Sequence, residues 1–173
     1  MGRLLYRTDR VVVTRPTPED ESEVIAAVQR SAALHHPWVP PPDTPELYRA
    51  YLQRIRKRDQ FGFLGRSRDG GSFVAIVNIS NVVLGAFRSG YLGYYVFSGR
   101  EAQGLMTETL AGLLHFAFGS MGLHRLEANI QPANTASIRL VERCGFCREG
   151  YSPQYLQIDG EWKDHERWAT TAG

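Results

Sequence analysis

The residues whose types and spacing best suit chemistry lie between positions 93 and 146. An apolar segment, 93–97, leads into a polar stretch, 98–103, and then into an amphipathic segment that opens with Gly104-Leu105-Met106-Thr107-Glu108. A strand, a loop and a helix in this order direct unpaired backbone N–H groups and the positive end of a helix dipole at one spot. The pattern therefore predicts an anion site, suited to a pyrophosphate group.

The elements that position this stretch are expected to form one α/β domain over residues 1–173, with a mixed sheet and helices packed on it. Hydrophobic periodicity and turn residues mark the elements. Strands are expected at 11–14, 61–67, 73–83, 90–97, 125–130, 155–158 and 162–169, and helices at 17–33, 44–57, 103–118 and 135–143. Asp159-Gly160 indicates a type I′ turn between the last two strands. The proline-rich segment 35–42 is expected to be a loop that carries Trp38.

Charge and hydropathy exclude several classes of function. The net charge is +2, and the basic residues are scattered. Nucleic-acid binding as the main role would need a concentrated basic face, so no direct nucleic-acid partner is expected. No apolar run is long enough to span a bilayer, and the first ten residues lack the apolar core of a signal peptide. These features predict no membrane partner and a cytoplasmic location.

Two cysteines, Cys144 and Cys147, form a C-x-x-C pair. Their small number is typical of a reducing compartment. No second pair of ligands has the spacing of a zinc site, and the cysteines follow a helix end rather than open a helix. No metal is therefore expected.

Taken together, these residues resemble the GCN5-related N-acetyltransferase (GNAT) superfamily and, within it, the RimJ/RimL branch. The segment 101–106 is similar to the Q/R-x-x-G-x-G/A loop that binds acetyl-CoA, and Met-Thr-Glu at 106–108 is similar to the branch's version of the helix start. Residues 134–137 resemble its N-x-x-S motif, 142–146 its E-x-x-G-F motif, and 155–165 its closing hairpin. The loop departs from the pattern with Glu and Ala at its first two positions, although the backbone amides remain.

The resemblance implies the GNAT fold, with a mixed, mostly antiparallel sheet of about seven strands, splayed at the cofactor cleft and flanked by about four helices. It also implies that acetyl-CoA binds between the strands that end at Phe97 and Ile130. A backbone N–H near Val96 would bond the thioester oxygen, and Asn134 would bond the pantetheine arm. The cofactor residues implied in this way are Tyr95, Val96, Phe97, Arg100, Gln103, Gly104, Leu105, Met106, Thr107, Asn134, Ser137 and Arg139.

The resemblance also makes Ser137 the candidate for protonating the CoA sulfur. Many relatives outside this branch carry a tyrosine one helical turn later for this purpose, and the nearby position here is Val141. The alternative for Ser137 is an ordinary polar residue in a first helical turn.

The identity of the general base is open. Relatives place a glutamate at two positions that hold Asn129 and Gln154 here. Glu127, on the polar face of the strand 125–130, is a candidate base. An ion pair with Arg125 or Arg139 is its structural alternative. Water is a further alternative, because an N-terminal amine has an ordinary pKa of about 7.7–8.

The acceptor is indicated by a closer resemblance to the RimJ-type subgroup at 78–83, 91–94 and 155–165. Members of that subgroup acetylate the N-terminal alanine of a small-subunit ribosomal protein. The resemblance implies direct attack on acetyl-CoA by a protein N-terminus (Ala or Ser), in an enzyme that is a monomer or homodimer. Candidate acceptor residues are Trp38, Asn78, Ser80, Asn81, Phe87, Tyr94 and Tyr155. Packing within the fold is the alternative role for each of them.

Two other functions remain as alternatives. One is acetylation of a small amine such as an antibiotic or an amino acid, which predicts a narrower and more acidic pocket. The other is a non-catalytic acyl-CoA-binding module, which the two missing glutamates would allow.

Overall fold

The computed structural model describes residues 2–173, and Met1, where the expected domain begins, lies outside the described residues. The strands are β1 (Leu4–Arg7), β2 (Val11–Thr14), β3 (Phe61–Ser67), β4 (Phe73–Val83), β5 (Ser89–Val96), β6 (Arg125–Ile130), β7 (Cys147–Ile158) and β8 (Glu161–Thr171). The helices are α1 (Glu21–Arg30), α2 (Ala32–His35), α3 (Pro45–Arg54), α4 (Leu105–Gly119) and α5 (Thr135–Arg143), with a 3-10 turn at Pro18–Asp20. None of the helices in this part of the chain has the length and apolarity needed to cross a bilayer.

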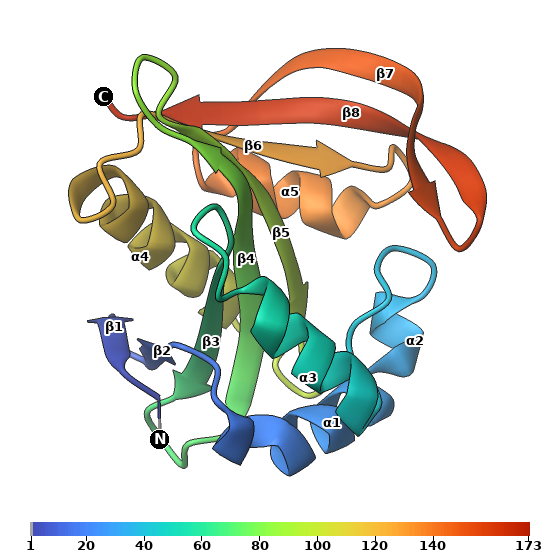
Figure 1. The fold of residues 1–173 in the computed structure, drawn as a ribbon. Coiled ribbons are helices and arrows are strands. Elements are labelled where there is room, and N and C mark those ends of the chain that lie inside the picture. Colours follow the sequence, from blue (N-terminus) through green and yellow to red (C-terminus); the bar gives the residue numbers. More distant parts are fainter. Residues whose placement is uncertain (1) are drawn as a thin grey trace.

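One eight-stranded sheet passes through the molecule in the order β1-β2-β3-β4-β5-β6-β8-β7 (Figure 1). Within residues 2–173, β5 and β6 form the only parallel pair of neighbours, and the remaining pairs are antiparallel. This arrangement confirms the expected mixed, mostly antiparallel sheet with helices on it.

Helices cover both faces of the sheet and close two apolar clusters. On one face, α4 and α5 contribute Leu110, Leu113 and Val141, which are fully buried against the strands. On the other face, α1 and α3 contribute Val24 and Tyr48, which are also fully buried. Each such side chain stabilises the fold by roughly 1.5–3 kcal/mol through removal of its surface from water. The helical spacing of these apolar residues is therefore what fixes each helix on its face of the sheet.

The sheet has one strand more than the sequence predicts, because Leu4–Arg7 pairs with β2 as β1. Its side chains are half-buried or exposed and show no clear alternation, so the usual signal of a strand is missing. Tyr6 fixes this strand to α4, since its hydroxyl donates to the Thr109 carbonyl at 2.8 Å. The strand β7 also begins earlier than expected, at Cys147. It contains Pro153, which is tolerated because β7 is an edge strand.

Two further local predictions have different outcomes. Asp159 and Gly160 both have positive φ angles, of 50° and 82°, which confirms the expected type I′ turn. The helix expected at 17–33 is divided into the 3-10 turn, α1 and the short α2. Residues 2–173 therefore contain five helices where about four were expected.

The feature that positions the site is the point where the parallel pair separates. Pairing between β5 and β6 extends only to Leu92 and Ala128. Beyond that point β5 continues to Val96 and β6 to Ile130 without pairing to each other. The sheet is therefore open in its middle, at the strand ends where the sequence predicts the cofactor cleft.

Candidate active site

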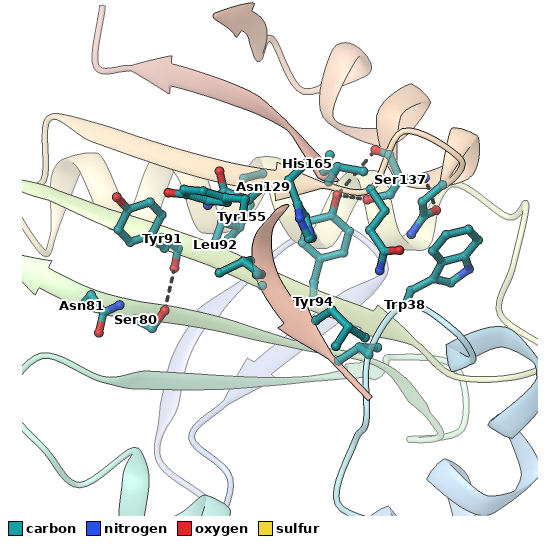
Figure 2. A pocket seen from close by; sticks show the side chains of 18 residues that line it. Trp38, Ser80, Asn81, Tyr91, Leu92, Tyr94, Asn129, Ser137, Tyr155 and His165 are labelled. Carbon is teal, nitrogen blue, oxygen red and sulfur yellow. Dashed lines mark hydrogen bonds between the residues drawn. The ribbon is translucent and has the colours of Figure 1, made fainter. Parts of the chain in front are cut away.

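A cavity of about 520 Å³ lies where β5 and β6 separate. Figure 2 shows the side chains that line it. They come from β4, from the ends of β5 and β6, from the start of α5, from the β7–β8 hairpin and from the segment after α2. None of the lining residues is Asp, Glu, Lys or Arg. The wall of the cavity is therefore neutral, apart from any charge on His165.

Ser137 and Tyr94 meet at this cavity. The two side-chain oxygens are 2.6 Å apart, and either hydroxyl can donate to the other (Figure 2). The Asn134 side chain accepts from the Ser137 backbone N–H at 3.1 Å, so Asn134 caps α5 and fixes its first turn. Burial raises the pKa of Tyr94, which keeps its phenol protonated. The pair is suited to supplying one proton to an atom in the cavity.

The backbone at the end of β5 presents a free edge to the cleft. The Phe97 N–H donates to the Val74 carbonyl on β4, so alternation turns the N–H groups of Val96 and Tyr94 to the other edge of the strand. The Val96 carbonyl on that edge is bonded by His35 Nε2 at 2.9 Å. The side chains of Tyr95 and Phe97 lie in the apolar cluster under α1 and α3. Only their backbone is therefore near the cleft.

The loop from 98 to 104 is curled, and its amides other than those of Ser98 and Arg100 have no partner among residues 2–173. Three of its residues, Gly99, Ala102 and Gly104, have positive φ angles of 82°, 56° and 76°, a geometry that gathers successive N–H groups. The helix α4 that follows has no side chain bonded at its N-terminus, whereas Thr44 caps α3. The first N–H groups of α4, including those of residues 105–107, are thus available to an anion. This is the geometry that the sequence predicts for a pyrophosphate.

An acid in the first turn of α4 is neutralised by the connection between β1 and β2. Arg10 Nε lies 2.6 Å from Glu108 Oε2, and the Thr8 hydroxyl donates to Glu108 Oε1 at 2.5 Å. Burial raises the pKa of Glu108, but these hydrogen bonds outweigh it and hold the pKa below its ordinary value. Arg10 also donates to the Gln103 carbonyl at 3.1 Å. Sequence reasoning missed the pair of Arg10 and Glu108 because the two residues are 98 positions apart in the chain.

The remaining side chains expected at the cofactor are less well placed. Arg100 donates to the Ser72 hydroxyl, so its guanidinium would have to leave that partner to reach a phosphate. Gln103 Nε2 donates to the Gly99 carbonyl at 2.8 Å and closes the loop. Arg139 is exposed on α5, and Glu101 is exposed on the loop. Leu105 is buried, and Met106 and Thr107 are half-buried.

Five of the seven residues expected at the acceptor line the cavity: Trp38, Ser80, Asn81, Tyr94 and Tyr155. The other two, Asn78 and Phe87, are not part of its lining. The Asn78 side chain accepts from the Tyr51 hydroxyl at 3.0 Å, which is the internal role that the sequence left open. Phe87 is 63% exposed, beyond the end of β4.

Glu127 is held in an ion-pair network outside the lining of the cavity. Its carboxylate is 2.8 Å from Arg125 Nε, and the same guanidinium also bonds Glu149 on β7. The structure therefore shows the ion pair with Arg125 that was the structural alternative for Glu127. Those contacts occupy the carboxylate that was considered as a base.

Sequence reasoning missed His165 as a residue of the site. His165 is 3% exposed and lines the cavity from β8. The β6–β8 register pairs Asn129 with Arg167, so His165, two residues away, shares the sheet face of Asn129. The Asn129 side-chain oxygen is buried and has no partner among residues 2–173. His165 could have been found by counting two residues along β8 from the partner of Asn129. That count requires the β6–β8 register, which the sequence alone does not give.

Comparisons with known proteins agree with this geometry. Residues 10–147 match the family model described as an acetyltransferase (GNAT) domain. The chain is 33% identical over 172 residues to the ribosomal protein uS5-alanine N-acetyltransferase of Escherichia coli (strain K12), covering 95% of this chain and 89% of that protein.

Solved structures show the same fold. The structure of Mycobacterium smegmatis RimJ in complex with CoA-disulfide matches with a TM-score of 0.84 and 30% identity, covering 94% of this chain and 82% of that one. The ribosomal-protein-S5-alanine acetyltransferase from Vibrio fischeri also matches with a TM-score of 0.84, at 24% identity, covering 96% of this chain and 95% of that one.

The splayed sheet, the amide loop before α4 and the cavity between β5 and β6 have the arrangement expected of an acyltransferase. With a family model that covers most of its length and a relative at 33% identity, this chain belongs to the GNAT family of N-acetyltransferases. It is similar over most of its length to RimJ ribosomal-protein-alanine N-acetyltransferases.

Proposed function

We propose that this protein transfers the acetyl group of acetyl-CoA to the N-terminal α-amino group of a protein that begins with alanine or serine. The acceptor that best fits its similarity to the Escherichia coli enzyme is a small-subunit ribosomal protein. The location that fits such an acceptor is the cytoplasm, with the enzyme acting as a monomer or homodimer.

The neutral wall of the cavity is the observation that carries this proposal. A polyamine or an aminoglycoside keeps additional positive charges after one amine has reacted, and each buried charge requires a carboxylate partner. The lining contains no carboxylate. A protein N-terminus carries one charge, which the reaction removes, and its peptide groups need only neutral partners. Ser80, Asn81 and Asn129 supply such partners, and the free Asn129 oxygen is suited to a peptide or amine N–H.

The amides of the 98–107 segment and the free edge of β5 fit acetyl-CoA as the acyl donor. The amides would hold the pyrophosphate, and Asn134, which caps α5, lines the cavity, while Arg139 is exposed on the same helix. When bound, acetyl-CoA supplies a thioester carbonyl, for which the Val96 N–H is the oxyanion donor. The hydroxyl pair of Tyr94 and Ser137 would protonate the departing thiolate.

The experiment that tests this function is thiol release from acetyl-CoA, measured with a panel of acceptors. Peptides that begin with Ala or Ser are compared with the same peptides carrying a blocked N-terminus, and with spermidine and an aminoglycoside. We expect turnover only with free Ala or Ser N-termini. Preference for a polyamine or aminoglycoside would contradict the proposal. CoA binding without turnover on any amine would instead favour a non-catalytic module.

The ribosomal acceptor is tested separately. The purified ribosomal protein uS5 with a free N-terminus is incubated with the enzyme and acetyl-CoA, and intact-mass spectrometry reads the product. We expect a single acetyl group on the N-terminal residue. Acetylation of internal lysines instead of the N-terminus would overturn this assignment.

A further inference from the structure

We propose that His165 is the general base of this enzyme, and that its Nε2 atom takes the proton from the acceptor's ammonium group. This inference rests on the proposed transfer of an acetyl group to an amine. It assigns the catalytic role that the sequence left open between Glu127 and water.

The hydrogen bond that His165 makes fixes its tautomer. His165 Nδ1 lies 2.9 Å from the Lys163 carbonyl oxygen. A carbonyl can only accept, so Nδ1 must carry the hydrogen. In the neutral ring the lone pair is then on Nε2, which is the arrangement that a base requires.

The Nε2 atom is free and reaches the cavity. No group within residues 2–173 bonds it, and it is not among the side-chain atoms that are sealed from solvent without a partner. His165 belongs to the cavity lining, with the Tyr155 ring centroid at 6.2 Å (Figure 2). Apart from tyrosines, whose phenols ordinarily titrate near 10, no other lining residue has a side chain that could accept a proton near neutral pH.

The carboxylates of Asp164 and Glu127 already have hydrogen-bond partners. Asp164, the neighbour of His165 on β8, accepts from the Tyr151 hydroxyl and from the Gln154 N–H. Glu127 on β6 is engaged by Arg125. Burial lowers the pKa of His165, opposed by the bond to the Lys163 carbonyl and by the Asp164 charge. The imidazole is therefore neutral at pH 7, ready to accept a proton.

The protons balance across the cavity. The acceptor enters as an ammonium group and gives one proton to His165 Nε2. The free amine attacks the thioester carbon, a C–N bond forms, and the C–S bond breaks with its electron pair remaining on sulfur. The sulfur takes one proton from the pair of Ser137 and Tyr94, and the second proton of the nitrogen replaces the one that the pair has given up. Two protons leave nitrogen in total, one ending on the CoA thiol and one in solvent after His165 is deprotonated again.

The test separates a base from a structural histidine. In His165→Asn, the amide nitrogen of asparagine replaces Nδ1 as the donor to Lys163, but no basic nitrogen remains. We expect kcat to fall about 10²-fold or more, with the KM for acetyl-CoA changed less than about threefold. The matched control is His115→Asn, at an exposed position on α4. A His165→Asn enzyme with kcat within threefold of the wild type would overturn the proposal.

Two more measurements guard against a variant that folds poorly. In His165→Ala, added imidazole should restore at least a tenth of the lost rate, and it should have no effect on the wild type or on His115→Asn. In the ¹⁵N-labelled wild-type protein, NMR should show His165 with a protonated Nδ1 and an unprotonated Nε2 near pH 7. A protonated Nε2 would overturn the proposal whatever the variants do.

The same experiments keep this proposal distinct from the proposed function. If the wild type acetylates no amine while CoA binds, the proposed function fails, and the base assignment fails with it. If the wild type acetylates Ala or Ser peptides and His165→Asn does so equally well, only the base assignment fails.

Discussion

Two buried histidines, His35 and His165, are alike in their exposure and in their hydrogen bond to a backbone carbonyl. They differ in which ring nitrogen makes that bond. Each is 3% exposed, and each bonds a backbone carbonyl at 2.9 Å. His35 uses Nε2 for that bond, and its Nδ1 is buried without a partner among residues 2–173. His165 uses Nδ1, and its Nε2 faces the cavity. Burial therefore does not decide the role of a histidine here, since the nitrogen left free decides it.

The two histidines act on different parts of the site. His35 packs edge-on against Tyr95, with ring centroids 5.0 Å apart, and holds the Val96 carbonyl. It thereby fixes the peptide whose neighbouring N–H is the proposed oxyanion donor. His35 is a positioning residue in this description, whereas His165 is the group that moves a proton.

Of the changes that test this difference between the histidines, His35→Ala is expected to have the largest effect. The change leaves the Val96 carbonyl unpaired and opens a cavity under α1 and α3, so we expect a loss of about 2–4 kcal/mol in the free energy of unfolding. His35→Gln places an amide N–H where Nε2 was, and should recover most of that loss and retain activity. Urea unfolding measures both. If His35→Gln abolished turnover in a stable protein, the positioning role would be wrong.

The next effect concerns the proton donor across the cavity from His165. Ser137→Ala removes one hydroxyl of the pair, and we expect kcat to fall about 10–10²-fold with little change in the KM for acetyl-CoA. Thr135→Ala, at an exposed position of the same helix turn, is the control. Steady-state kinetics with an Ala-starting peptide reads the result. Full kcat in Ser137→Ala would remove this residue from the mechanism.

A smaller effect is expected on stability as the pH falls. Burial lowers the pKa of both His35 and His165 from the ordinary value of 6.5, so the unfolded chain binds protons at a higher pH than the folded one. The free energy of unfolding should therefore be constant above about pH 7 and decrease as the pH drops through 6.5, by on the order of 1 kcal/mol. Unfolding curves at pH 7.5 and pH 5.5 measure this loss. In His35→Gln, which lacks one of the two titrating histidines, the loss in the free energy of unfolding between these pH values should be smaller.

The smallest expected effect is that of Glu127→Gln. The carboxylate is paired with Arg125 and lies outside the cavity lining, so kcat should change less than about threefold. The partly exposed pair should contribute at most about 1 kcal/mol to stability. A large loss of kcat here, together with an active His165→Asn enzyme, would move the role of base from His165 to Glu127.

Much of the fold follows from local patterns. The helical spacing of Leu110 and Leu113 placed α4 correctly on the sheet, and the Asp159-Gly160 pair gave the right hairpin turn. The strand β1 was missed because the side chains of Leu4–Arg7 are mostly exposed to some degree and do not alternate. Its position depends on a contact with α4, which local sequence patterns do not report.

The site could be predicted where it is built from consecutive residues. The loop before α4 and the helix that follows Asn134 could be predicted because each is a local motif. The sequence could not predict that Phe87 lies outside the cavity lining and that His165 belongs to it. Both depend on how strands distant in sequence are paired. The tautomer of His165 depends on one carbonyl, and no pattern of residue types encodes it.

The early end of pairing with β6 leaves β5 with an unpaired edge inside the molecule. Amide hydrogens in the middle of a sheet of this width usually exchange with solvent only when the whole domain opens. The amides of Tyr94 and Val96 turn toward this inner edge, so in the free protein they should exchange orders of magnitude faster than those of Ile76 and Val77 on the neighbouring strand. Hydrogen exchange can therefore report binding in the cleft, because a bound ligand should slow the exchange of these two amides.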